Sequence, residues 1–164
     1  MTRLSKDDYY MGLALMTAAR STCLSRHVGA VIVDHDGVIS TGYNGPPRGL
    51  KHCAELGGCQ RKKAKSGEGM DLCRAVHAEL NAIIQAARTG VSLRNTSMYC
   101  IYSPCRSCMG AIINAGIDMV YYMKQYSDYE IPKQMADETG VTLIKVSVSL
   151  INEIRKIDPW SLSD

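Results

Sequence analysis

His77-Ala78-Glu79, followed by Pro104-Cys105-Arg106-Ser107-Cys108, is the part of this 164-residue sequence that decides its fold. The histidine and the two cysteines are three ligands of the kind that hold zinc at catalytic sites, where the fourth position stays open for water. Glu79 stands two residues after the histidine, where a carboxylate can move the protons of that water. A zinc site that only staples a fold usually has four protein ligands. Three ligands with an adjacent acid therefore favour a catalytic site over a structural one.

The first half of the motif opens a predicted helix over residues 76–88. Its apolar spacing places Ile83, Ile84 and Ala87 on the inward face, and Gly90 is the expected stop. His77 therefore lies at a helix N-terminus, where the positive end of the helix dipole favours anionic groups nearby.

The second half follows a predicted strand over residues 97–102 and opens a helix over residues 105–115. A proline fits the start of a helix, where its missing N–H group is not needed. Cys105 and Cys108 are three residues apart and so face the same side of that helix. The helix dipole also favours their thiolate form. The metal is therefore predicted to lie between two helix N-termini.

The remaining pattern predicts an α/β protein with one mixed five-stranded sheet between helical layers. Strands that alternate with helices after residue 76 imply parallel pairing through right-handed crossovers, behind an antiparallel hairpin. We expect a single domain over residues 1–164, with a long, cysteine-rich, zinc-binding insertion at about 45–75. The other expected elements are a helix at 6–22, a strand at 28–33, a turn at 34–37, strands at 38–43, 118–123 and 141–146, a helix at 132–138 and a helical segment at 150–157.

Composition points to a globular protein of the cytoplasm. Hydrophobic residues make up 46% and charged residues 21% of the chain, and no apolar run approaches the ~20 residues that span a bilayer. The first residues contain no apolar secretory segment, so we expect the thiols to remain reduced. Seven cysteines in a reducing compartment are better explained by metal binding than by disulfides.

The net charge of +3 is concentrated in one segment. Glu55 is the only acidic residue among residues 48–65, and the basic residues there are Arg48, Lys51, Arg61, Lys62, Lys63 and Lys65. Such a cluster suits phosphates, but it also suits a solvated loop, and charge alone does not decide between them. No aromatic residue is interleaved with the lysines, which argues against a nucleic-acid polymer as partner and against a non-catalytic RNA-binding zinc module.

Five segments resemble the deoxycytidylate (dCMP) deaminases, and the resemblance runs over nearly the full length of the chain. The segments are 21–23, 28–33, 42–49, 77–83 and 103–108. The zinc motif itself is shared by cytidine, guanine, tRNA-adenosine and riboflavin-pathway deaminases. The Gly-Tyr-Asn-Gly run at residues 42–45 and the cysteine-rich insertion narrow the likeness to the dCMP branch. A zinc deaminase of cytidine or of tRNA adenosine remains the alternative.

The resemblance implies a three-layer α/β/α cytidine-deaminase-like fold and hydrolysis of dCMP to dUMP and ammonia. In that reaction hydroxide on the catalytic zinc attacks C4 of cytosine, and Glu79 carries the protons. Ser25 and Arg26 are candidates for the 5′-phosphate, Asn44 for the sugar or base, and Tyr126 with Tyr129 for closing over the nucleotide. Ordinary packing of the two tyrosines is the alternative. The full expected substrate set is Ser25, Arg26, Asn44, Ala78, Ser103, Pro104 and Tyr126.

The resemblance also implies a second, structural zinc. Its expected ligands are Cys23, Cys53, Cys59 and Cys73. Four thiolates would close a tetrahedral site, and a long Gly-rich loop that buries little apolar surface needs such a staple. His52 competes for one ligand position, and free thiols are the other alternative. Cys100 lies inside a predicted strand and is expected to be a buried small hydrophobe.

Regulation is the last implication of the resemblance. It implies a homohexamer that is activated by dCTP and inhibited by dTTP, each bound with Mg²⁺. We expect the effector at a subunit interface against residues 42–49, with Arg88 as a relay or, alternatively, in a surface salt bridge. The residues assigned to this site are Gly42, Tyr43, Asn44, Gly45, Arg48 and Gly49.

Overall fold

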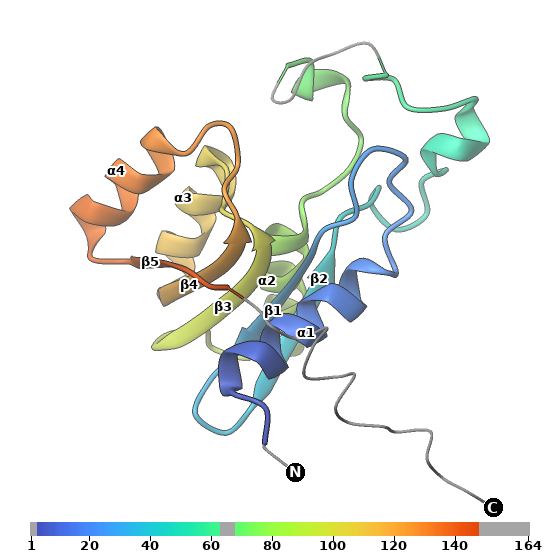
Figure 1. The fold of residues 1–164 in the computed structure, drawn as a ribbon. Helices are drawn as coiled ribbons and strands as arrows, with labels where there is room; N and C mark the ends of the chain where they lie inside the picture. Colours follow the sequence, from blue (N-terminus) through green and yellow to red (C-terminus); the bar gives the residue numbers. More distant parts are fainter. Residues whose placement is uncertain (1–2, 63–67, 148–164) are drawn as a thin grey trace, which may run out of the picture.

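The structure, a computed structural model, describes residues 3–62 and 68–147 and contains one five-stranded sheet with helices on both faces (Figure 1). The helices are α1 Lys6–Ala18, α2 Ala78–Thr89, α3 Arg106–Ala115 and α4 Glu130–Thr139, and the strands are β1 Gly29–Val33, β2 Val38–Tyr43, β3 Thr96–Tyr102, β4 Ile117–Lys124 and β5 Thr142–Lys145. Two 3₁₀ turns, Cys53–Leu56 and Met70–Leu72, interrupt the long loop that the sequence predicts.

The strand order is β2-β1-β3-β4-β5. Strand β1 pairs antiparallel with both β2 and β3, whereas β3, β4 and β5 are parallel. Helices α3 and α4 provide the two crossovers between the parallel strands. The predicted mixed five-stranded sheet, with an antiparallel hairpin ahead of parallel units, is confirmed.

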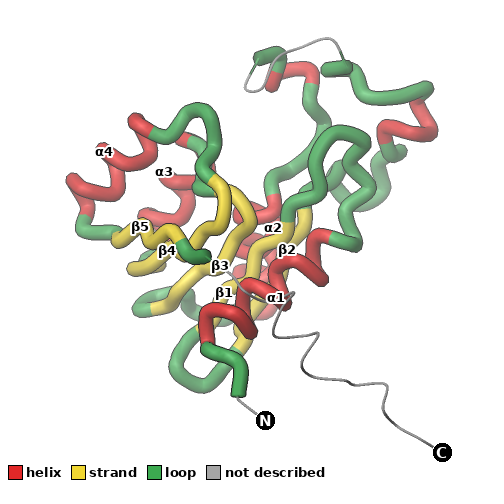
Figure 2. The backbone as a smooth tube through the Cα atoms, in the orientation of Figure 1, coloured by secondary structure: helices red, strands yellow, loops and turns green. Residues whose placement is uncertain are grey.

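Two apolar cores lie on the two faces of the sheet. The larger core joins the sheet to α2, α3 and α4, and includes the fully buried Met98, Cys100, Met109, Ile112 and Val120. The smaller core lies under α1 and includes Met11, Ala14, Val31, Val33 and Tyr99. Figure 2 shows the same arrangement, with α3 and α4 beside each other and α1 against β1. Burial of Cys100 is as predicted.

Helix α2 packs against β2 more closely than the sequence suggested. A Cβ atom added at Gly42 would lie 2.3 Å from the backbone nitrogen of Ala82 and 2.3 Å from the carbonyl oxygen of Ala78. The helix consequently buries its small side chains, whereas Ile84 and Ala87 are exposed and Ile83 is half-buried. The predicted inward face of α2 is therefore wrong for Ile84 and Ala87, because the helix turns Ala78, Ala82 and Ala86 toward the closely packed sheet and leaves these two residues on its outer side.

Substituting Gly42→Ala tests this contact. The new methyl group would overlap two backbone atoms of α2, so we expect a loss of about 3 kcal/mol of unfolding free energy. Gly110→Ala is the matched control, because its new Cβ would meet only the flexible end of Met135 at 3.8 Å. Chemical denaturation measures both variants. Equal stability of the two would show that α2 can move away from β2 without penalty.

Helix α1 ends at Ala18, four residues earlier than predicted. The chain then turns, and the Ser21 hydroxyl forms hydrogen bonds with the backbone oxygen and the side-chain oxygen of Asn44. The predicted helical segment 150–157, together with Lys63 and Lys65, lies outside the described residues. None of the described helices combines the length and the apolar character that a bilayer crossing requires.

Candidate metal centre and substrate pocket

His77 is fixed by contacts between the start of α2 and the end of β2. Gly45 and Val76 form an isolated antiparallel bridge through two backbone hydrogen bonds of 3.1 and 2.8 Å. His77 is the N-cap of α2, and its carbonyl accepts from the Asn81 backbone. The Asn81 side chain donates to the Tyr43 carbonyl at 2.8 Å. The backbone that carries the His77 imidazole is therefore fixed by hydrogen bonds on both sides, at Val76 and at Asn81.

The two cysteines are placed by the end of β3. The Ser103 N–H donates to the carbonyl of Lys124 on β4 at 2.8 Å, so the chain stays paired as far as the proline. Cys105 is then the N-cap of α3 and Cys108 lies in its first turn. Because β3 and β1 are neighbours and α2 packs on β1 and β2, the N-termini of α2 and α3 meet at one end of the sheet.

The three predicted ligands converge. The Nδ1 atom of His77 lies 3.5 Å from the Sγ atom of Cys105 and 3.4 Å from that of Cys108. Zinc–nitrogen and zinc–sulfur bonds of 2.0–2.3 Å at a tetrahedral angle separate such atoms by about 3.6 Å. The three donor atoms thus already have the spacing and the chemistry of a zinc site with one open position.

The protonation of the site fits this assignment. The pKa of Cys105 is lowered to about 4, mainly because the thiol of Cys108 donates a hydrogen bond to it, with His77 adding a second bond. The pKa of His77 is raised, first by its hydrogen bond with Cys105. Metal ions bind cysteine as the thiolate and histidine as the imidazole, and they release protons when they bind. A thiolate beside an imidazole is therefore suited to hold a metal ion.

Glu79 lies in the wall of the same pocket and is 5% exposed. The pKa of its carboxyl group is raised, because burial disfavours the charged form. A carboxyl group whose pKa is raised gives up its proton less readily than an ordinary carboxyl group, and this suits a residue that must hold a proton and then deliver it. The position predicted for the proton carrier is therefore buried beside the ligands, as acid–base chemistry requires.

The pocket at this end of the sheet has a volume of about 230 Å³. The predicted residues Ser25, Arg26, Asn44, Ala78, Ser103 and Tyr126 line it together with His77, Glu79 and Cys105. Pro104, also predicted, is fully buried and does not line the pocket. The structure adds Cys23, Val28, Arg61, Cys73, Ala75 and Tyr102 to the wall.

Arg26 lies between two aromatic rings of the pocket. Its guanidinium carbon is 5.5 Å from the centre of the Tyr102 ring and 5.6 Å from that of Tyr126. Cation–π contacts of this kind orient the guanidinium without using all of its N–H donors. Sequence reasoning missed Tyr102, although its place at the carboxyl end of a parallel strand, where ligands bind in α/β sheets, was a usable signal.

Asn44 and Ser103 both support the pocket wall. The Asn44 side-chain oxygen accepts from the Val28 N–H at 2.9 Å, and its amide donates to the Arg26 carbonyl at 2.8 Å. The Ser103 hydroxyl accepts from the Tyr126 N–H at 2.8 Å. Each polar side chain thus fixes a loop that carries another pocket residue.

Tyr129, expected beside Tyr126 over the nucleotide, lies elsewhere. Its hydroxyl is 3.0 Å from that of Tyr122, and its ring packs against the larger core. It does not line the pocket. The alternative of ordinary packing is therefore correct for Tyr129, because the turn before α4 directs its ring inward.

The other four predicted metal ligands lie near one another, in a looser group. The thiols of Cys59, Cys23 and Cys73 all add to the burial that raises the pKa of Cys53. Within the described residues, only His77–Cys105–Cys108 and the exposed Asp34–His35–Asp36 turn bring three possible ligand atoms within 4.8 Å. His52, the competing ligand, instead has its Nδ1 atom 2.7 Å from the Thr22 hydroxyl.

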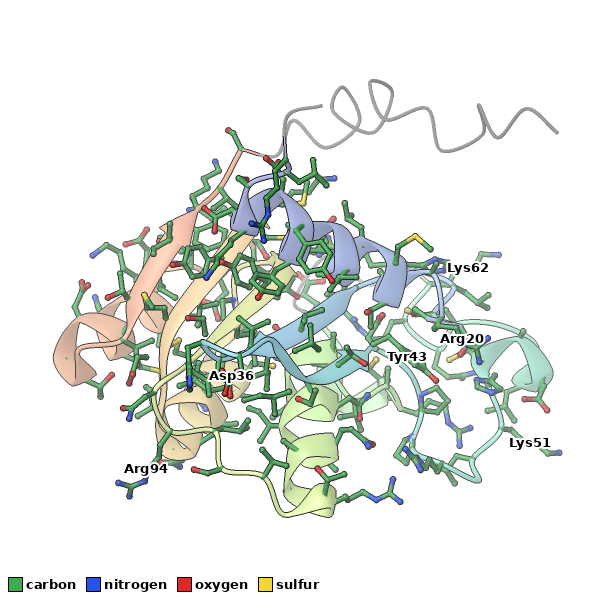
Figure 3. All side chains as sticks on the ribbon, turned by 90° about the horizontal axis from the view of Figure 1, so that it is seen from below. Arg20, Asp36, Tyr43, Lys51, Lys62 and Arg94 are labelled. Carbon is green, nitrogen blue, oxygen red and sulfur yellow. The ribbon has the colours of Figure 1, made fainter. Side chains whose placement is uncertain are left out.

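Some residues of the segment expected to bind an effector already pack against α2. Gly42 faces α2 at van der Waals distance, so its missing side chain serves packing and leaves no room for a ligand there. Arg48 bonds the side chain of Gln85 on α2 at 3.2 Å. Gly49 has a φ of +85°, and a Cβ atom added there would meet nothing within 4 Å beyond its chain neighbours. Figure 3 shows Arg20, Lys51 and Lys62 at one end of the molecule, away from Asp36 and Arg94.

Comparison with known proteins agrees with this geometry. Residues 4–124 match the family described as the cytidine and deoxycytidylate deaminase zinc-binding region. The chain is 39% identical over 147 residues to a deoxycytidylate deaminase of Saccharomyces cerevisiae, covering 90% of this chain but 46% of the yeast protein. It is 37% identical over 149 residues to ComE operon protein 2 of Bacillus subtilis, covering 90% of this chain and 75% of that protein.

A solved structure shows the same fold. The dCMP deaminase of cyanophage S-TIM5, in complex with dCMP and dUMP, superposes with a TM-score of 0.73 at 26% identity, covering 88% of this chain and all of that one. The chain therefore spans less than half of its yeast relative and most of its bacterial and phage relatives. Its sequence, its fold and the convergence of His77, Cys105 and Cys108 lead to one conclusion: the chain belongs to the cytidine and deoxycytidylate deaminase family.

Proposed function

We propose that this protein hydrolyses dCMP to dUMP and ammonia. The observation that carries the proposal is the position of the His77 Nδ1 atom, 3.5 and 3.4 Å from the Sγ atoms of Cys105 and Cys108, beside a buried carboxyl group in a pocket that also contains an arginine. The deaminase names of the relatives and the dCMP and dUMP bound to the cyanophage enzyme support the choice of substrate.

His77, Cys105 and Cys108 would hold the catalytic zinc. When bound, zinc acidifies a water molecule and so supplies a nucleophile at neutral pH. Glu79 would take one proton of the attacking water and deliver it to N3 of the cytosine ring while the C–O bond forms at C4. It would then take the proton of the new C4 hydroxyl and pass it to N4, so that the C4–N4 bond breaks and ammonia leaves a C4 carbonyl. Ala78 and Val28 line the pocket and would form an apolar wall around the cytosine ring.

Release of ammonia tests the activity directly. Zinc-loaded protein should release it from dCMP, faster with dCTP–Mg²⁺ and more slowly with dTTP–Mg²⁺, with cytidine and a tRNA anticodon hairpin as comparison substrates. Turnover that ignores both triphosphates would remove the regulatory part and keep the enzyme. Release from cytidine or the hairpin but not from dCMP would assign the same site to another substrate.

Arg26 is proposed to bind the 5′-phosphate. A guanidinium paired with a phosphate contributes about 3 kcal/mol through two charge-assisted hydrogen bonds, so Arg26→Gln should raise KM for dCMP about 100-fold. The kcat/KM for deoxycytidine, which has no phosphate, should stay within a factor of about three. Arg20→Gln removes a positive charge six residues earlier in the chain without touching the pocket and is the control. Parallel losses with both substrates would refute the assignment.

We also propose the second zinc on Cys23, Cys53, Cys59 and Cys73. The contribution of the Cys59, Cys23 and Cys73 thiols to the raised pKa of Cys53 supports it, and the Thr22 contact of His52 favours cysteine over histidine. Zinc content should fall from two ions to one per chain in Cys53→Ser and stay at two in the neighbouring His52→Ala. Two ions in both variants would leave these thiols free of metal.

The effector site and the hexamer remain part of the proposal. Tyr43, Asn44, Gly45, Arg48 and Gly49 form the segment beside α2 that would face a triphosphate with Mg²⁺. An effector that acts through this segment must bind one quaternary state better than the other. Exposed Ile84 on α2 lies near the Arg48–Gln85 contact and suits burial between subunits.

A further inference from the structure

One buried polar atom has no partner among the protein groups around it. The Nε atom of Arg74 is shielded from solvent and makes no hydrogen bond. Within residues 3–62 and 68–147, no other buried nitrogen or oxygen atom of a buried or half-buried side chain is in this state. Buried N–H groups in folded proteins nearly always donate to an acceptor. The Arg74 N–H group therefore points to an acceptor that the protein acquires by binding something.

The substrate pocket does not supply that acceptor. The residues on either side of Arg74, Cys73 and Ala75, line the pocket, whereas Arg74 itself is not part of the wall. The guanidinium proposed to bind the substrate phosphate is that of Arg26, on another segment of the chain. Arg74 is therefore separate from the substrate-binding residues, and its N–H group needs an acceptor elsewhere.

The thiols proposed to hold the second zinc come together from segments far apart in the sequence. Cys23 and Cys73 line the same pocket. Thr22, the residue before Cys23, has its hydroxyl 2.7 Å from the Nδ1 atom of His52, the residue before Cys53. This contact holds the segment of Cys23 against that of Cys53.

Cys59 is directed back toward Cys53 by a tight turn. The Gly58 N–H group donates to the Cys53 carbonyl at 2.8 Å, so the chain reverses just before Cys59. Burial and the three other thiols raise the pKa of Cys53, whereas the positive charge of Arg74 acts in the opposite direction. The Arg74 guanidinium is therefore within electrostatic reach of Cys53 as well as next to Cys73 in the chain.

We propose that Arg74 is the charge partner and hydrogen-bond donor of the four-cysteine zinc site. This role depends on the second zinc site proposed above. A zinc ion bound by four thiolates leaves an excess of negative charge on the sulfur atoms, and buried negative charge requires a cation or N–H donors nearby. Arginine suits this role because it is always protonated and carries several N–H groups in one plane. The Nε–H group of Arg74 would find its acceptor among these sulfur atoms.

Arg74 is a positioning residue in this proposal, because it contacts no group that reacts. It acts through the cysteines, and Cys23 and Cys73 are part of the pocket wall. The Cys23 Sγ atom also accepts from the Ser25 N–H group at 3.5 Å, so it is tied to the turn that carries Ser25 and Arg26. Outer partners of metal ligands orient the ligands and tune the affinity of the site. The decisive readout is therefore metal binding and not turnover.

Competition with a chromophoric zinc chelator tests this role in the full chain. Arg74→Gln removes the charge and the Nε–H group, and we expect it to bind one of its two zinc ions about 10–100-fold more weakly than the parent protein does. Lys62→Gln is the matched control, because it removes an exposed cation three residues after Cys59. Its zinc affinities should stay within about threefold of those of the parent. Arg74→Lys keeps the charge without the planar donor group and should lie between the two variants.

A double-mutant cycle separates this role from a general loss of structure. In Cys53→Ser, which lacks one ligand of the second site, adding Arg74→Gln should change the affinity for the remaining ion by less than about threefold. Equal weakening with and without Cys53 would overturn the proposal, because Arg74 would then act on the other metal site or on the whole fold.

Two further results would also overturn it. Arg74→Gln that holds both ions as tightly as Lys62→Gln would refute the role of Arg74 and leave the second site in place. A parent chain that binds one zinc ion would remove the four-cysteine site itself. Ammonia release from dCMP reports on the site of His77 and Glu79, so failure of the deaminase activity and failure of this inference are distinguishable.

Discussion

Replacing Glu79 by glutamine should abolish turnover of dCMP while the zinc content stays unchanged. Glutamine preserves the volume of this 5%-exposed side chain but cannot accept or release a proton at neutral pH. Proton transfer by a positioned carboxyl group contributes about 10²–10⁴-fold to a rate, and here one group must serve both N3 and the leaving amine. We therefore expect kcat to fall by at least about 10³-fold.

The measurement pairs ammonia release with zinc analysis and with binding of dCMP to the same preparation. Zinc and dCMP should bind Glu79→Gln about as well as they bind the parent protein, because the three ligands and Arg26 are untouched. A variant with near-normal kcat would show that another group moves the protons. A variant without zinc would instead show that Glu79 is needed to organise the ligands.

Cys105→Ala should remove the catalytic zinc and, with it, all detectable activity. Only His77 and Cys108 would remain as ligands. A site with two protein ligands binds zinc too weakly to keep it when the protein is diluted. Because a bound ligand stabilises the folded state, the loss should also lower the unfolding free energy by about 3 kcal/mol at zinc concentrations some 100-fold above the Kd. The thermal midpoint of the parent should rise on zinc loading more than that of the variant.

Cys100→Ala is the matched control for that experiment. Cys100 is fully buried in β3, and its thiol bonds the Tyr102 carbonyl at 2.9 Å. It is outside the group of three converging ligands. Removing it should cost about 1 kcal/mol of stability and keep both zinc and turnover. If it lost zinc as Cys105→Ala does, general destabilisation would explain both results.

The metal ligands were predictable because their positions depend on local structure. His77 and Cys105 are helix N-caps, as the start of each helix indicated, and a spacing of three places Cys108 on the same side as Cys105. Strands β2 and β3, which precede the two helices, both run antiparallel to β1 between them, so the N-termini of α2 and α3 lie at the same edge of the sheet. The mixed sheet and the ligand triad therefore follow from patterns within short segments.

The inner face of α2 was not predictable in the same way. Hydrophobicity alone assigned the isoleucines inward, yet the helix buries Ala78, Ala82 and Ala86. The deciding fact is the approach of Gly42, which lies 36 positions or more before these residues and on another element. The place of Tyr102 in the pocket and of Tyr129 in the core was missed for a similar reason, because ring direction depends on the strands and turns that meet around each ring.

The bridge between Gly45 and Val76 has a consequence for how this protein can change. Residues 46–75 leave and re-enter the fold at a single point, and lengthening a loop closed in this way costs only about 0.6 kcal/mol per doubling. Arg61, Cys73 and Ala75 of this loop form pocket wall, whereas Glu79 and the three ligands stand on the rigid elements beyond it. A change in this loop would therefore alter one wall of the pocket, while Glu79 and the three predicted ligands keep their places on the helices.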